Sequence, residues 1–95
     1  MKIDFKKSFT GHDGETIGMI DEHLRLVLFS ADSSDRFMLS AEEKYLAYKI
    51  GKRLLEEGGN IDLTVEEAGF IKKVCSFGLR AGAYGQLIDL IEGCQ

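Results

Sequence analysis

Polar and apolar residues alternate near the start of the chain, with apolar positions at Ile3, Phe5 and Phe9. A period of two residues is typical of a half-buried strand, so we expect a strand over residues 2–9. Residues 11–15 include two glycines and an aspartate, which are typical of a turn, and residues 16–18 can return as a second strand. The pattern predicts a small N-terminal β-hairpin.

The spacing then changes to helical intervals between residues 17 and 31, with apolar positions at Ile17, Ile20, Leu24, Val27, Leu28 and Ala31. These residues fall on one stripe of a helix, which we predict over about residues 19–30. A strand remains the alternative, because residues 24–29 also alternate. Met19, Leu26 and Phe29 lie off the main stripe.

A capping box predicts the start of the next helix at Ser40, because the serine hydroxyl can accept from the amide of Glu43 while the Glu43 side chain reaches back. The helical period continues to about Glu57 and gives apolar residues on two sides, namely Leu46, Ile50 and Leu54 on one and Tyr48 and Leu55 on the other. Such a helix is expected in the middle of a small domain. Gly51 in its interior predicts that another backbone passes close by.

Residues 58–67 predict a helix-strand-helix corner. Two glycines end the preceding helix, Ile61 centres a short strand, and Thr64 with Glu67 forms a second capping box. The corner resembles an EF-hand, but with Gly59 at the sixth loop position the first, third, fifth and twelfth positions are Leu54, Glu56, Gly58 and Val65. Calcium needs oxygen ligands at most of these positions and a carboxylate at the last, so we expect no calcium site.

Two further helices are predicted, over residues 64–78 and 81–92. Gly78 suits a left-handed helix end. Phe70 and Phe77 lie seven residues apart on the edge of the first of these helices, where they either widen the core contact, which we favour, or form an exposed apolar strip. The last helix is expected to dock against the preceding helices or against a second copy of the chain, since its glycines weaken its first turn.

These elements predict a single domain over residues 1–95 of the α+β class, mostly α. A short N-terminal β-hairpin is followed by a compact bundle of about four helices that contains the EF-hand-like, non-calcium corner.

Composition narrows the possible functions. The formal net charge of −4 disfavours strong non-specific binding to nucleic acid. No apolar run approaches the roughly 18 residues that cross a bilayer, and the N-terminus lacks the apolar segment of a signal peptide, so we expect a cytoplasmic protein with no membrane contact. Cys75 is expected in the core and Cys94 near a frayed end, both as free thiols.

The residues that could carry chemistry do not form a recognised motif. His12, Asp13, Glu15, Glu22 and His23 suggest a metal site, but their spacing matches no known ligand pattern, and a solvated turn is the favoured interpretation. The sequence contains no glycine-rich phosphate loop, Cys-x-x-Cys pair or nucleophile elbow. We therefore expect no catalytic residues, no metal, no cofactor and no enzymatic activity.

Several segments are similar to small proteins of tailed bacteriophages and prophages, most of which have no assigned function. The similar segments are Met1–Phe5, Asp13–Glu15, Leu39–Lys44, Ile61–Glu67, Ile71–Lys73 and Gly85–Gln86. The resemblance implies expression in a bacterial host cytoplasm and no known cofactor, and it carries over no catalytic residue.

The favoured function is a non-enzymatic protein-binding module, a phage product that modulates a host protein or assists phage assembly. The candidate partner-binding residues are Tyr45, Tyr48, Lys49, Lys52, Phe70 and Phe77. The alternative is a nucleic-acid-binding regulator with a local basic patch made of Lys49, Lys52, Arg53, Lys72, Lys73 and Arg80. A homodimer through the C-terminal helix is also compatible with the sequence.

Overall fold

The computed structural model describes residues 1–31 and 38–93, so the prediction for Cys94 lies outside the described residues. The elements are β1 (Lys2–Asp4), β2 (Ser8–Thr10), β3 (Thr16–Met19), α1 (Ile20–Phe29), α2 (Ala41–Glu56), β4 (Asn60–Asp62), α3 (Val65–Gly78) and α4 (Ala81–Glu92). The predicted α+β class with mostly helical content is confirmed. Segment 20–29 is a helix, so the strand alternative is wrong.

The N-terminal segment divides between two small sheets. β2 pairs with β3 in the expected hairpin, with an irregularity in register between Phe9 and Thr10. β1 instead pairs antiparallel with β4, the strand of the corner, and places Ile3 opposite Ile61. Both isoleucines are fully buried. The single strand expected over residues 2–9 is therefore two strands, and the first of them holds the corner.

Both predicted capping boxes are present. The Ser40 hydroxyl accepts from the amide of Glu43, and the Glu43 carboxylate accepts from the amide of Ser40. Thr64 and Glu67 make the same reciprocal pair at the start of α3. These bonds satisfy amides that a helix N-terminus otherwise leaves unpaired, which is why the sequence located both starts to within one residue.

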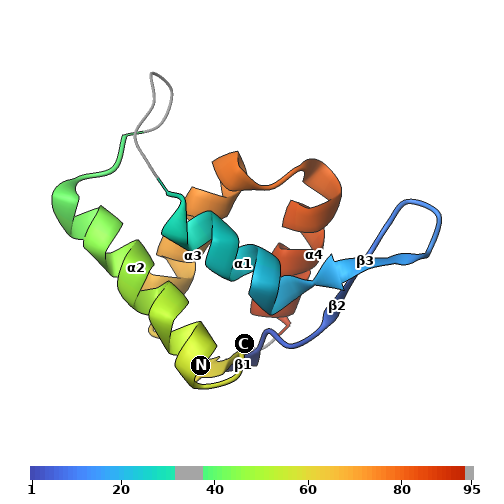
Figure 1. The fold of residues 1–95 in the computed structure, drawn as a ribbon, viewed down its shortest axis with the longest axis horizontal. Coiled ribbons are helices and arrows are strands. Elements are labelled where there is room, and N and C mark those ends of the chain that lie inside the picture. Colours follow the sequence, from blue (N-terminus) through green and yellow to red (C-terminus); the bar gives the residue numbers. More distant parts are fainter. Residues whose placement is uncertain (32–37, 94–95) are drawn as a thin grey trace.

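The central helix is α1, not α2. Figure 1 shows α1 crossing the front of the molecule, with α2 on one side, α4 on the other and α3 behind. α2 buries Ala47, Ile50, Gly51 and Leu54 but leaves Tyr48 and Leu55 exposed. The expectation that its two apolar sides place α2 in the middle is therefore wrong, because its second side faces solvent.

Two glycines allow α1 to pack closely on its neighbours. A Cβ at position 51 would lie 2.9 Å from Cε2 of Phe29, so α1 does approach Gly51 closely, but with side chains and not with the backbone that was predicted there. A Cβ at position 78 would lie 2.5 Å from Cγ1 of Val27. The left-handed conformation predicted for Gly78 is wrong, since the positive φ angles belong to other glycines. Gly78 is required for space instead.

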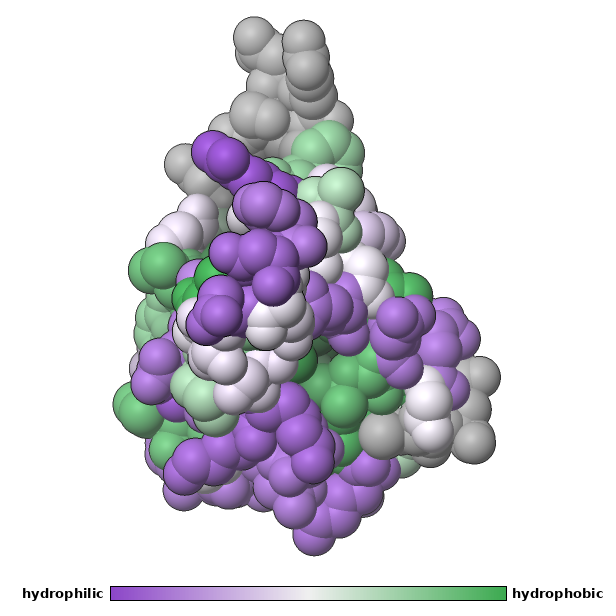
Figure 2. Space-filling view, turned by 90° about the vertical axis from the view of Figure 1, so that its right-hand side faces the viewer, coloured by the Kyte–Doolittle hydropathy of each residue, from purple (hydrophilic) through white to green (hydrophobic). Residues whose placement is uncertain are grey.

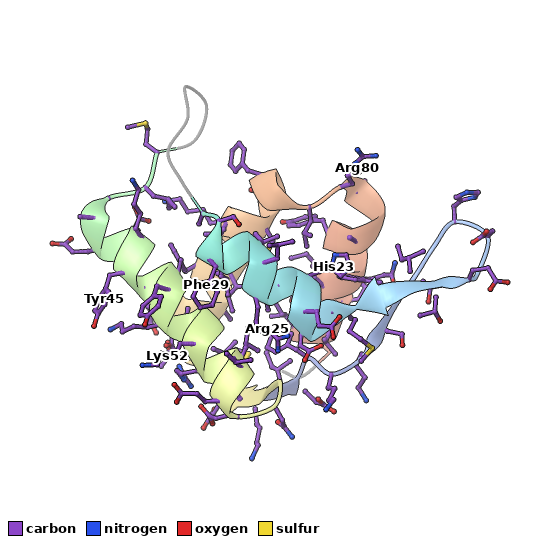
Figure 3. All side chains as sticks on the ribbon, viewed as in Figure 1. His23, Arg25, Phe29, Tyr45, Lys52 and Arg80 are labelled. Carbon is purple, nitrogen blue, oxygen red and sulfur yellow. The ribbon has the colours of Figure 1, made fainter. Side chains whose placement is uncertain are left out.

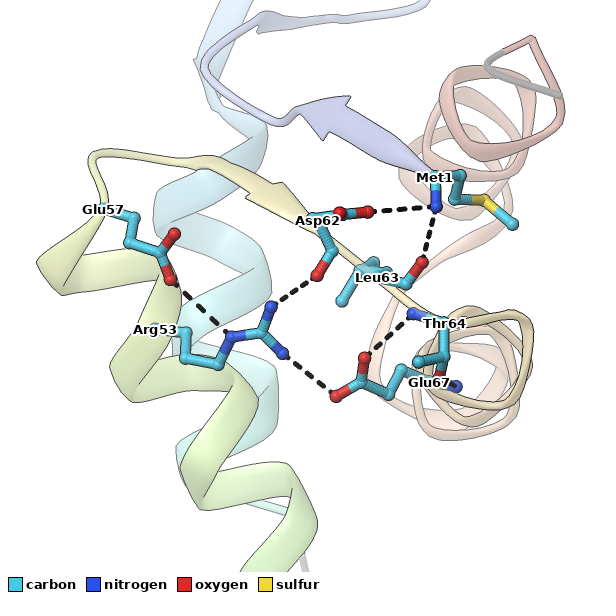
Figure 4. A network of polar contacts seen from close by, with 7 residues as sticks. All are labelled: Met1, Arg53, Glu57, Asp62, Leu63, Thr64 and Glu67. Carbon is cyan, nitrogen blue, oxygen red and sulfur yellow. Dashed lines mark hydrogen bonds and ion pairs between the residues drawn. The ribbon is translucent and has the colours of Figure 1, made fainter.

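A polar network fixes the corner (Figure 4). The Arg53 guanidinium lies 3.0 Å from the Glu67 carboxylate, lies 3.6 Å from that of Glu57, and donates to the backbone oxygen of Asp62. The Met1 amino group donates to the Leu63 oxygen at 2.7 Å and pairs with Asp62 at 3.0 Å. The cation that pairs with both Glu57 and Glu67 is thus the Arg53 side chain.

Candidate protein-binding surface

Three aromatic side chains form a row on the outer side of α1 and α2, with Tyr48 in contact with the other two. The rings of Tyr45 and Tyr48 are stacked with centroids 6.1 Å apart, and Phe29 meets Tyr48 edge to face at 5.5 Å. All three remain exposed, at 61% for Tyr45, 42% for Tyr48 and 51% for Phe29. We call Phe29, Tyr45 and Tyr48 the aromatic cluster.

The backbone explains why these rings meet. Tyr45 and Tyr48 are three residues apart on a helix, which places them on the same face of α2. Phe29 is the last residue of α1, and the absence of a side chain at Gly51 lets its ring lie against α2. The signal that could have identified Phe29 from sequence is its position off the buried stripe of its helix, combined with a glycine in the neighbouring helix.

Basic side chains border the aromatic cluster. The Lys49 ammonium lies 5.0 Å from the centroid of the Tyr45 ring, within the range of a cation–π interaction. Lys52, one turn further along α2, pairs with Glu56 at 3.8 Å. In Figure 3, Phe29, Arg25, Tyr45 and Lys52 lie on the side of the molecule where α1 and α2 run next to each other. The surface combines apolar rings with the positive charge of Lys49 and with two ion pairs, Lys52–Glu56 and Arg25–Asp21.

The two candidate phenylalanines of α3 have different environments. Phe70 is only 8% exposed and belongs to the core, which confirms the core interpretation and corrects its inclusion among the partner-binding residues. Phe77 is 57% exposed, so the favoured core interpretation is wrong for this residue. It lies on α3, whereas the aromatic cluster is built from α1 and α2. Of the six candidates, the structure therefore brings together Tyr45, Tyr48, Lys49 and Lys52 along α2.

The candidate basic patch is dispersed over α2, α3 and the α3–α4 junction, and four of its six cations are paired with carboxylates. Lys52 pairs with Glu56, Arg53 with Glu67 and Glu57, Lys72 with Glu92, and Lys73 with Glu43. Lys73, followed by the Ser40 amide, holds the pKa of the Glu43 carboxyl below its usual value. Because each ion pair would have to be broken to free a cation, this arrangement disfavours a basic surface for nucleic acid.

Both histidines line one groove at the other side of α1. The groove encloses about 570 Å³ between the β2–β3 hairpin, α1 and the start of α4, and its lining residues include His12, Ile17, His23, Leu79 and Arg80. No carboxylate among the described residues lines it. Within residues 1–31 and 38–93, no group of three or more His, Cys, Asp or Glu side chains is arranged to hold a metal ion.

Cys75 lies in the core, as expected, and is fully buried. Burial raises the pKa of its thiol from the ordinary 9.0 to about 12, because the thiolate would lose its hydration. A thiol in this environment is a packing residue and a poor nucleophile at neutral pH.

The chain has no match among protein family models, curated proteins or solved structures. The resemblance to phage proteins remains a prediction. Over the described part of the chain, none of the helices combines the length and the apolar character needed to cross a membrane.

Proposed function

We propose that this protein is a non-enzymatic protein-binding module that contacts its partner through the aromatic cluster, and that it acts in a bacterial cytoplasm as a phage product that modulates a host protein or assists phage assembly. The observation that carries the proposal is that Tyr48 contacts both Phe29 and Tyr45 while all three rings remain exposed. Tyrosine is enriched among the residues that dominate protein interfaces, because its ring buries a large area with few rotatable bonds.

The energetics favour an interface role for these rings over a folding role. Each ring leaves roughly half of its surface in water, so folding gains only part of the free energy that full burial of an aromatic side chain provides. A partner that covered the aromatic cluster would gain the remainder. The stacking of Tyr45 on Tyr48 also holds both rings before binding, which lowers the entropy cost of association.

The chemistry of the border indicates the kind of partner. Lys49 lies over the Tyr45 ring, so a partner segment that carries an acidic residue next to apolar ones would complement this surface. Lys52 also flanks the rings, but it is paired with Glu56. The nucleic-acid alternative has less support, because a stacking surface for a strand needs free cations along it, and Lys52 and Arg53 are in ion pairs.

The test is capture from a bacterial lysate with the immobilised protein, followed by binding measurements with each captured protein. We expect a Tyr45→Ser, Tyr48→Ser double variant to bind the partner at least about tenfold more weakly, since central interface aromatics contribute 2 kcal/mol or more. The matched control is Val65→Ser, which removes an exposed apolar side chain at the start of α3. Equal binding by both variants, or capture of nucleic acid alone, would contradict the proposal.

A further inference from the structure

The groove next to the β2–β3 hairpin differs in its charge from the rest of this acidic protein. Its lining includes Arg80, His12 and His23, with no carboxylate from the described residues. Four cations of α2 and α3, namely Lys52, Arg53, Lys72 and Lys73, each pair with a carboxylate. Within residues 1–31 and 38–93, no carboxylate lies at ion-pair distance from Arg80. An arginine and two imidazoles therefore share one groove in which the described part of the chain supplies no anionic partner.

The groove is built by three separate parts of the chain. The hairpin contributes Thr10 and His12, α1 contributes His23, and the α3–α4 junction contributes Arg80. The His23 ring packs on two sides. It meets the Phe9 ring edge to face at 5.3 Å, and it approaches Gly18 so closely that a Cβ there would lie 2.6 Å from Nε2 of His23. In Figure 3, His23 lies between α1 and α4, below Arg80 at the start of α4.

Among the polar side chains that line this groove, namely Thr10, His12, His23 and Arg80, hydrogen-bond donors outnumber acceptors. A guanidinium only donates hydrogen bonds, and each imidazole offers at least one N–H group. Arg80 is also the N-cap of α4, and its side chain makes no capping bond. The groove walls are apolar at Ile17, Leu79 and Ala83. Figure 2 views this side of the molecule, where an apolar area is set back between projecting hydrophilic side chains.

We propose that this groove binds a phosphomonoester with an apolar body, with the phosphate at Arg80 and the histidines and the body against Ile17, Leu79 and Ala83. A phosphate monoester carries close to two negative charges and several acceptor oxygens, which match one arginine and two imidazole donors better than a single carboxylate does. The volume of about 570 Å³ is in the range of small-molecule sites. This site is separate from the aromatic cluster, and the inference does not depend on the proposed partner binding.

The probe is phenyl phosphate, whose binding is observed by nuclear magnetic resonance at fixed ionic strength. Inorganic phosphate and phenol, each of which carries only one half of the probe, are titrated separately as partial ligands for comparison. We expect saturable shifts at the amides of residues 81–83 and at the rings of His12 and His23, with phenyl phosphate binding more tightly than either partial ligand. Binding of inorganic phosphate as tight as that of phenyl phosphate would overturn the assignment of an apolar subsite. Shifts that do not saturate, or that lie outside the groove, would overturn the site.

Charge-matched variants locate the site. Arg80→Ala should weaken phenyl phosphate binding about tenfold, because a charged hydrogen bond is lost, and His12→Ala should weaken it about threefold. The control is Lys6→Ala, which removes the same charge from an exposed position outside the groove and should change affinity less than about twofold. Both Arg80 and His12 are exposed, so their removal leaves the core intact. Equal losses in the Arg80 and Lys6 variants would overturn the proposal.

Discussion

The side-chain amide of Gln86 binds the backbone of Thr10 in both directions. The Thr10 amide donates to Oε1 of Gln86 at 2.8 Å, and Nε2 of Gln86 donates to the Thr10 oxygen at 2.7 Å. The Gln86 side chain thus makes the two hydrogen bonds with the Thr10 backbone that a neighbouring strand would otherwise make. The two bonds join residues 76 positions apart in the sequence, and they position Thr10, which lines the groove, relative to α4.

Replacing Gln86 with Ala should loosen the hairpin from α4. Two hydrogen bonds to Thr10 and one to the Gly82 oxygen are lost at an exposed site, so we expect a fall of about 1–2 kcal/mol in the free energy of unfolding. The sharper readout is hydrogen exchange: the Thr10 amide should exchange faster, while the Phe5 amide, which is bonded to the Gly59 oxygen at 2.7 Å, should not change. Asp89→Asn in the same helix is the control. Unchanged exchange at Thr10 would show that Gln86 does not hold the hairpin.

Alanine substitutions at two glycines of α3 should change stability in opposite directions. Gly78→Ala places a Cβ 2.5 Å from Val27, a stiff β-branched side chain, and should cost about 1–3 kcal/mol through overpacking. Gly69→Ala meets no atom within 4 Å and should stabilise the protein by up to about 1 kcal/mol through helix propensity. Urea unfolding of both variants is the measurement. A Gly78→Ala protein as stable as Gly69→Ala would contradict the close contact between α1 and α3.

Arg53 should be needed at the corner for its shape as well as its charge. Arg53→Lys keeps the charge but cannot reach Glu57, Glu67 and the Asp62 oxygen together, so we expect a loss of about 1–2 kcal/mol in unfolding free energy. Lys52→Ala, which breaks a solvent-exposed pair on the same helix, should change stability by less than about 1 kcal/mol. Equal effects would mean that the corner is held by β1–β4 pairing and the capping box alone.

The local elements could be predicted from the sequence because their signals are local. The capping boxes at Ser40 and Thr64 and the helical spacing of apolar residues are read within one or two turns. The pairing of β1 with β4 could not be predicted, since it joins residues about sixty positions apart and short strands carry no mark of their partner. For the same reason Gln86 was not identified as a partner of Thr10.

The candidate surface was predicted in part. The positions of Tyr45 and Tyr48 on one face of α2 follow from helical spacing, but their exposure depends on whether another element covers that face. The sequence suggested that α2 is the central helix. The central helix is α1, because Gly51 of α2 and Gly78 of α3 leave room for its side chains. The assignment of Phe70 to a partner surface was wrong, because this side chain packs into the core instead of facing solvent.

Burial of Cys75 should make the stability of the protein depend on pH in the alkaline range. The folded protein favours the neutral thiol, with a pKa of about 12 against the ordinary 9.0, so this contribution is complete below pH 9 and is lost as pH rises from 9 toward 12. Above pH 9 the advantage of wild type over Cys75→Ala should shrink by up to about 1.4 kcal/mol per pH unit. Both proteins in this comparison also carry Cys94→Ser, so Cys75 is the only cysteine in which they differ. The contributions of lysine and tyrosine titration to the unfolding free energy are the same in both proteins and cancel in the difference. A difference that stays constant from pH of about 7 to about 10 would contradict the burial of this thiol.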